Sequence, residues 1–137
     1  MSDQSIDVAA AWLTNESGDV LICRRASTEP RAGFWEFPGG KFEAGESGVD
    51  ALVRELNEEL RLAVHCGKLL ETAEHQYANG RFRIHLFACT KLDDSEPVLT
   101  VHDEMAWVAP SDLLSYNLLP GDVPIIKSYL AKVDGLL

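Results

Sequence analysis

The sequence predicts a single α/β domain of mixed topology. Three observations support this class. Short apolar segments of strand length occur before and after residue 47, a 3.6-residue apolar period begins near Ser47, and a second helical segment lies near the C-terminus. The 137 residues, of which 46% are hydrophobic and 25% charged, suffice for one hydrophobic core. The chain contains no internal repeat, low-complexity tract or linker that would divide it.

The N-terminal third begins with a predicted hairpin. Residues 6–13 form an apolar run of strand length, the turn cluster TNESGD follows, and VLICRR at residues 20–25 is a second strand. Residues 26–48 are rich in Gly, Pro and Ser, which predicts a long loop with room for a short strand. Because long ordered loops in compact domains are usually functional, this loop is a candidate part of a site.

A helix is predicted after this loop. Ser47 and Asp50 have the spacing of a capping box, so the helix is expected to start at Ser47. Apolar residues recur at i, i+3, i+4, i+7 and i+11 and form a stripe expected to face the core. These residues are Val49, Leu52, Val53, Leu56 and Leu60.

The remaining elements are shorter or less regular. Residues 68–77 and 81–90 are predicted strands on either side of the turn ANG. MAWV is a short strand, PSDLL begins a brief helix, and DVPIIKSYLAKV forms a longer helix with Asp122 as candidate N-cap.

Charge and cysteine content exclude several classes of protein. With 22 acidic and 12 basic residues the net charge is −10, which argues against general nucleic-acid binding because phosphate tracking needs a basic surface. No stretch approaches the ~18 apolar residues of a membrane span, and MSDQSID has no signal-peptide or transit-peptide pattern. Cys23, Cys66 and Cys89 are widely spaced, which predicts reduced thiols in a cytoplasmic protein and no disulfide frame or zinc site.

The predicted helix carries a cluster of acidic residues. Glu55, Glu58 and Glu59 have the spacing i, i+3 and i+4, which places three mutually repelling charges on one face. They form either a solvated acidic face or a platform for hard divalent cations, which prefer oxygen ligands. The preceding PGGK turn favours the platform, because its free carbonyls and the helix carboxylates together suit magnesium with positions left for phosphate oxygens.

Residues 40–62, GKFEAGESGVDALVRELNEELRL, resemble the Nudix box, G-x5-E-x7-R-E-U-x-E-E-x-G-U, in which U is a bulky aliphatic residue. The matching residues are Gly40, Glu46, Arg54, Glu55, Leu56, Glu58, Glu59 and Leu62. Only the penultimate glycine of the motif is missing, and Arg61 replaces it. RRA, GFWEFPGGK, WV and LLPGDVPII extend the resemblance to MutT-like members over roughly the whole chain.

The resemblance implies a fold, a reaction and a metal. The Nudix fold is a mixed β-sheet sandwiched between helices, expected here as one domain over residues 1–137. The resemblance implies that Glu55, Glu58 and Glu59, with the carbonyl of Gly39, hold Mg²⁺, for which Mn²⁺ could substitute. The metal would bridge the phosphates of a nucleoside triphosphate and activate the attacking water, releasing a nucleoside monophosphate and pyrophosphate. The expected partner is thus a small nucleotide and not a nucleic acid or membrane, bound by a monomer or homodimer.

Two residues of the motif are expected to support the carboxylates. By resemblance, Arg54 orients a catalytic carboxylate; the alternative is an ordinary i, i+4 pair with Glu58 worth ~0.3–0.5 kcal/mol. Glu46 either anchors the loop or acts as a base beside the metal ligands; the alternative is simple compensation of the helix dipole.

The substrate contacts also follow from the resemblance. Arg25 would reach the base or the sugar, unless it only ends an exposed strand. Trp35 and Phe37 would stack on the nucleobase, unless both belong to the core. Lys41 of the PGGK turn completes the candidate contacts. The four histidines, His65, His75, His85 and His102, show no metal-ligand spacing and are assigned to structure.

One acidic residue of the MutT-like pattern has no certain counterpart. Several members use a further acid just before the WV strand. Val101 occupies one such position, which leaves Asp103 and Glu104 as candidates for the ligand or general base.

The residue at position 122, an Asp, is expected to influence which nucleobase the protein prefers. MutT-like members read the nucleobase edge from the loop before the last helix, and those specific for oxidised guanine carry Asn there. An ionised Asp only accepts hydrogen bonds, and cytosine offers its N4 amino group. The sequence therefore favours CTP, dCTP or 5-modified dCTP over 8-oxo-dGTP, unless Asp122 merely caps the helix.

Other functions within and beyond hydrolysis are alternatives to this one. Within the family, dinucleoside polyphosphates, nucleotide sugars and capped RNA ends are rival substrates. A non-catalytic nucleotide sensor is the alternative of another class, but such domains tend to lose box glutamates that this chain keeps.

Overall fold

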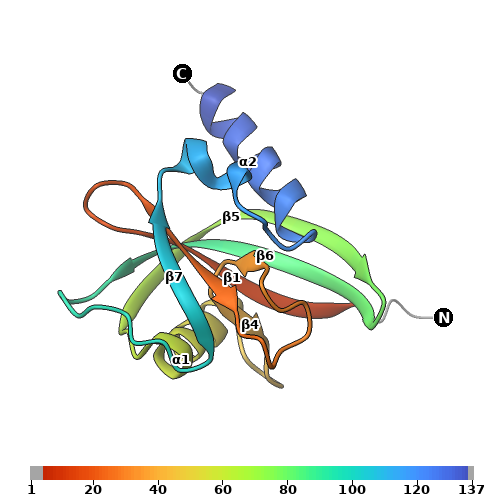
Figure 1. Cartoon of the computed structure of the whole chain (residues 1–137), viewed down its shortest axis with the longest axis horizontal. Helices are drawn as coiled ribbons and strands as arrows, with labels where there is room; N and C mark the ends of the chain where they lie inside the picture. The colour runs from red at the N-terminus through yellow and green to blue at the C-terminus, as the bar shows by residue number, and fades with distance from the viewer. Residues whose placement is uncertain (1–4, 136–137) are drawn as a thin grey trace.

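A seven-stranded mixed sheet forms the centre of the molecule in the computed structural model, which describes residues 5–135 (Figure 1). Its strands are β1 (Ile6–Thr14), β2 (Val20–Arg25), β3 (Trp35–Glu36), β4 (Gly39–Lys41), β5 (Val64–Tyr77), β6 (Gly80–Lys91) and β7 (His102–Val108). The order is β3-β2-β1-β6-β5, with β4 beside β1 and β7 beside β2. β1 and β6 pair in parallel, whereas the other pairs are antiparallel.

Helices cover both faces of this sheet. Helix α1 (Gly48–Leu60) lies on one face, and α2 (Asp122–Gly135), preceded by the 3₁₀ helix η1 (Pro110–Ser115), lies on the other (Figure 1). The arrangement confirms the predicted class, a mixed sheet between helices.

The apolar run of β1 explains why two cores form. Successive side chains of a strand point to opposite faces, so Ala11 and Leu13 pack with α1 while Ala10 and Trp12 pack with α2. A strand buried on both faces must be continuously apolar, which is why its sequence does not alternate. The sheet is therefore held by one hydrophobic cluster on each side.

Most element boundaries agree with the sequence. Ser47 is the N-cap of α1, and its Oγ accepts the N–H of Asp50 at 3.1 Å, as predicted. The loop after β2 contains two short strands, β3 and β4, where room for one was expected. Strand β5 begins at Val64, four residues before the predicted 68.

One core prediction is wrong. Val53 was expected to face the core, but it is 40% exposed, while Leu52, Leu56 and Leu60 are fully buried. Val53 lies at the margin of the apolar stripe, 100° from Leu52 on a helical wheel. The stripe that packs on the sheet is therefore narrower than the pattern of apolar residues.

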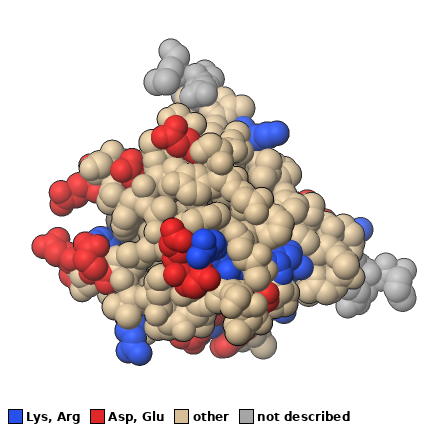
Figure 2. Space-filling view, viewed as in Figure 1, with Lys and Arg blue, Asp and Glu red and all other residues tan. Residues whose placement is uncertain are grey.

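The cysteines are free and buried, in agreement with the predicted reduced thiols. Cys66 and Cys89 are opposite each other on β5 and β6, and their sulfur atoms are 2.7 Å apart. No helix among residues 5–135 is long and apolar enough to cross a membrane. On the face shown in Figure 2, basic side chains are scattered or lie beside acidic ones.

Helix α1 ends at Arg61 in the left-handed conformation, with φ 53° and ψ 36°. Glycine adopts this conformation without the steric cost that a Cβ brings. We therefore expect Arg61→Gly to raise the free energy of unfolding by about 1 kcal/mol. Urea unfolding measures it, with Arg61→Ala as the control that removes the charge but keeps the Cβ. A destabilised Arg61→Gly, or equal stabilisation by both variants, would contradict this account of the helix end.

Candidate active site

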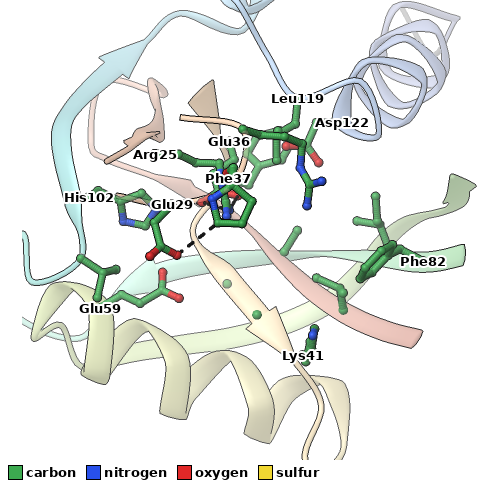
Figure 3. A pocket seen from close by; sticks show the side chains of 18 of the residues that line it. Arg25, Glu29, Glu36, Phe37, Lys41, Glu59, Phe82, His102, Leu119 and Asp122 are labelled. Atoms are coloured by element: carbon green, nitrogen blue, oxygen red, sulfur yellow. Dashed lines mark hydrogen bonds and ion pairs between the residues drawn. The ribbon is translucent and has the colours of Figure 1, made fainter. Parts of the chain in front are cut away.

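A pocket of about 380 Å³ lies between β4, the end of α1 and the start of α2 (Figure 3). Six of the candidate catalytic, metal-binding and substrate-binding residues line it: Arg25, Phe37, Gly39, Lys41, Glu59 and Asp122. In Figure 3, Glu59 and Lys41 lie on the side of α1, and Asp122 lies at the opposite side beside α2. The pocket thus joins the acidic helix to the start of the last helix, and Glu59 and Asp122 are 63 residues apart in the sequence.

Glu59 is the acidic residue of α1 that reaches into the pocket. Its Oε1 is buried without a hydrogen-bond partner among the described residues. Burial is the main cause that raises the pKa of Glu59 to about 10, and a hydrogen bond with Glu55 and the negative charges of Glu55 and Glu36 add to it. The N–H of Gly39 hydrogen-bonds to the carboxylate and opposes the shift. In the free protein this carboxyl group therefore favours its protonated form.

Glycine at position 40 makes room for Glu55. A Cβ added to Gly40 would lie 2.4 Å from Oε2 of Glu55, so any side chain there would displace the carboxylate. The PGGK turn thus lets a helix carboxylate approach the backbone of β4, which is the close contact that its glycines predicted.

Arg54 holds the loop and the carboxylates together. Its Nε and Nη2 donate to the two oxygens of Glu46 at 2.7 and 3.0 Å, and Nη1 donates to Glu55 Oε1 at 2.6 Å. Its Nη2 also donates to the carbonyl of Lys41 at 3.1 Å. The i, i+4 contact with Glu58, at 3.3 Å, is the longest of these. The contacts favour the orienting role of Arg54 over the ordinary helix pair.

Glu46 anchors the loop to the helix. Besides Arg54, it accepts the N–H of Glu43 at 2.8 Å. The hydrogen bond from Arg54, followed by that from Glu43, lowers the pKa of Glu46 to about 2. A carboxylate with so low a pKa stays ionised and is a poor general base, so the geometry favours the anchoring role.

The other acidic candidates lie outside the pocket lining. The side chain of Glu58 is 58% exposed and turned toward Arg54. Asp103 and Glu104 pair with Arg24 at 2.9 and 3.0 Å. Val101, which occupies one of the positions considered for this acid, lines the pocket. Asp103 and Glu104, the two acidic candidates of β7, therefore do not line the pocket.

The donors at the α1 end suit a hard divalent cation. The carboxyl groups of Glu55 and Glu59 are in contact and offer oxygen atoms of the kind that such a cation prefers, and the unpartnered Oε1 of Glu59 would gain from one. Among residues 5–135, no three Asp, Glu, His or Cys side chains are close enough together to form a ready metal cluster. Binding through three carboxylates therefore requires Glu58 to turn away from Arg54.

Sequence reasoning missed Glu36 and His102. Glu36 accepts from Arg25 Nη1 at 3.0 and 3.2 Å, and it contacts Nε2 of His102 at 2.9 Å. The His102 side chain is only 5% exposed, and both residues line the pocket. The sequence could have indicated Glu36, because it lies between two aromatic residues of the loop already assigned to the site. Nothing in the sequence indicated its pairing with His102, which is 66 residues away.

Arg25 and Phe37 have structural contacts as well as places in the pocket lining. The Nε of Arg25 donates to the carbonyl of Pro30 at 2.7 Å, in addition to its bonds with Glu36. Phe37 is 5% exposed and packs against Trp12 with ring centres 5.9 Å apart. Most of the surface of Phe37 is therefore buried in the hydrophobic core, as the alternative to nucleobase stacking predicts.

Asp122 is the buried acid at the other end of the pocket. Burial, reinforced by the charge of Glu36, raises the pKa of Asp122 to about 8, while the N–H of Phe37 and the charge of Arg25 oppose the shift. The sequence predicts an ionised Asp122, but burial favours the protonated acid at neutral pH. Asp122 is the first residue of α2, and its contact with Phe37 is one that a simple helix cap would not make.

Comparison with known proteins decides the family. The model of the NUDIX domain matches residues 4–129. The chain belongs to the NUDIX family. It is 37% identical to the CTP pyrophosphohydrolase of Escherichia coli over 128 residues, which cover 92% of each chain. It is 38% identical to the 8-oxo-dGTP diphosphatase of Haemophilus influenzae over 137 residues, which cover 100% of each chain.

A solved structure supports the same fold. The MutT protein of Methanosarcina mazei matches with a TM-score of 0.86 and 22% identity, over 96% of this chain and 97% of that one. This likeness concerns the fold. The family match and the two relatives show that the chain is a Nudix hydrolase, and α1 with the preceding loop is the segment that carries the Nudix box.

Proposed function

We propose that this Nudix hydrolase cleaves nucleoside triphosphates to a nucleoside monophosphate and pyrophosphate and prefers cytosine nucleotides when Asp122 is ionised. The observation that carries the proposal is one pocket with Glu59, Gly39 and Lys41 at one side and Asp122 at the other. A nucleotide has the matching polarity, with phosphates at one end and a base at the other. The two relatives, named for CTP and for 8-oxo-dGTP, support the class of substrate.

The phosphate end is the side of α1. Glu55, Glu58 and Glu59 would hold Mg²⁺, or Mn²⁺ in its place, together with Gly39. A divalent cation bound there neutralises phosphate charge and lowers the pKa of a bound water. Arg54 keeps Glu55 in place through its 2.6 Å contact. Lys41, which lines the pocket, adds a positive charge for the phosphates.

The base end is the side of α2. Phe37 offers an apolar surface, and the carboxyl group of Asp122 offers hydrogen bonds to the base edge. An ionised Asp122 accepts only and suits the N4 amino group of cytosine. A protonated Asp122 both donates and accepts, as Asn does, and suits 8-oxoguanine. The balance between the two substrates therefore depends on the protonation of Asp122.

This dependence predicts a shift of specificity with pH. As pH rises from 7 to 9 through the raised pKa of Asp122, the carboxylate form grows. We expect the ratio of kcat/KM for dCTP to that for 8-oxo-dGTP to rise by about fivefold or more over this range. The ratio is the right measure because ionisations that affect both substrates equally, such as that of Glu59, cancel.

Asp122→Asn is the control for this prediction, because it fixes a group that donates and accepts at every pH. Its ratio should stay flat and favour 8-oxo-dGTP, and 5-methyl-dCTP should follow dCTP in both proteins. A wild type that prefers 8-oxo-dGTP by tenfold or more at every pH, or an unchanged ranking in Asp122→Asn, would refute the cytosine assignment.

A further inference from the structure

Arg31 stands out in the loop between β2 and β3. It has a φ of 57°, and only one other non-glycine among the described residues, Arg61, has a positive φ. The loop is held in this shape by Arg25, whose Nε donates to the carbonyl of Pro30 and whose N–H donates to the carbonyl of Phe34 at 2.9 Å. A strained backbone conformation persists only where surrounding contacts enforce it, and such residues gather at binding sites.

The Arg31 side chain is directed onto an aromatic ring of another element. Its guanidinium carbon lies 4.4 Å from the centre of the Tyr77 ring, at the end of β5. Both residues line the pocket. Within residues 5–135, Arg31 forms no ion pair, and its Nε is buried without a hydrogen-bond partner. Stacking fixes the plane of the guanidinium and leaves its in-plane N–H groups free to donate.

Tyr77 also fixes the start of α2. Its hydroxyl oxygen accepts the N–H of Gly121 at 2.7 Å. A Cβ on Gly121 would lie 2.7 Å from the same oxygen, so only glycine permits this approach. The next residue is Asp122, and the charges of Asp122 and Arg31 both act on the Tyr77 hydroxyl. One aromatic side chain thus positions a donor-only cation and a hydrogen-bonding acid in the same pocket.

We propose that Arg31, stacked on Tyr77, forms the base-reading end of the pocket together with Asp122 and selects bases that carry both an oxo and an amino group. Arg31 only donates, and its matching partner is the exocyclic oxygen of a base, whereas Asp122 accepts from an amino group. Cytosine and guanine offer both groups. Adenine has no oxo group, and uracil has no amino group. This selection rests on the proposed function and specifies which nucleotides the pocket admits.

Equilibrium binding of CMP, GMP, AMP and UMP without metal tests the selection. Monophosphates report on the base end and require no hydrolysis. The wild type should bind CMP and GMP at least fivefold more tightly than AMP and UMP. Arg31→Met, which keeps an unbranched chain over Tyr77 but removes every donor, should weaken CMP and GMP by fivefold or more and change AMP by less than twofold.

Arg24→Met is the matched control, because it removes one positive charge from a residue that pairs with Asp103 and Glu104 outside the pocket lining. It should leave all four dissociation constants unchanged. Both variants should unfold at the same denaturant midpoint as the wild type, within experimental error. The proposal is overturned if the wild type binds none of the four monophosphates or does not prefer CMP and GMP. It is equally overturned if Arg31→Met weakens all four alike. If instead the proposed function is wrong, the protein will hydrolyse no nucleoside triphosphate although it still binds CMP and GMP more tightly than AMP and UMP.

Discussion

Replacing Glu59 with Gln is expected to lower kcat for nucleoside triphosphates by on the order of 10²-fold or more while the fold is retained. Gln has nearly the shape of Glu and can still accept the N–H of Gly39, but it brings no negative charge to a metal. Burial already disfavours the charged carboxylate in the free protein, since it raises the pKa of Glu59 to about 10. Removing the ionisable group should therefore leave stability at neutral pH unchanged or slightly higher.

Steady-state kinetics in magnesium measure the loss, and urea unfolding confirms that the variant is folded. Glu16→Gln, at an exposed position in the turn after β1, makes the same chemical change outside the pocket lining and should keep full activity. Near-wild-type turnover by Glu59→Gln would show that α1 does not carry the active site.

Gly39→Ala is expected to destabilise the protein by about 3 kcal/mol or more. Gly39 has a φ of 149°, and a Cβ there would lie 2.0 Å from the carbonyl oxygen of Ala9. That oxygen belongs to β1, the central strand of the sheet, and cannot move without breaking the β1–β4 pairing. The same change would displace the backbone that contacts Glu59, so activity should fall together with stability.

Gly45→Ala separates the two causes of this loss. Gly45 also has a positive φ, 80°, but a Cβ there meets nothing within 4 Å. Gly45→Ala should lower the free energy of unfolding by only about 1 kcal/mol, which is the cost of the backbone conformation alone. If urea unfolding gives equal losses for the two variants, close contact with β1 is not what requires glycine at position 39.

The sequence predicted best where its signals are local. The cap at Ser47, the helix of α1 and the glycine turn each depend on residues within a few positions of one another. The box spacing also placed Glu55 and Glu59 correctly beside the turn. These features are set by helical periodicity and by short-range hydrogen bonds, which are visible in a single sequence.

Contacts between segments that are distant in the sequence could not be predicted from these local patterns. A run such as that of β1 indicates a buried strand, but it does not say that β6 is the parallel partner. Likewise, His102 meets Glu36, and Tyr77 meets Gly121, only through the tertiary fold. The protonation of Asp122 also depends on burial, which the sequence does not give, and so the assumption of an ionised group failed.

The central claim is tested most directly by offering the wild type all common and oxidised nucleoside triphosphates with magnesium and identifying the products by ³¹P NMR. We expect pyrophosphate and the nucleoside monophosphate, with cytosine nucleotides giving the highest kcat/KM at pH 9, where Asp122 is mostly ionised, and Glu59→Gln giving the background. Release of orthophosphate with a nucleoside diphosphate, or no hydrolysis of any triphosphate beyond that background, would contradict it.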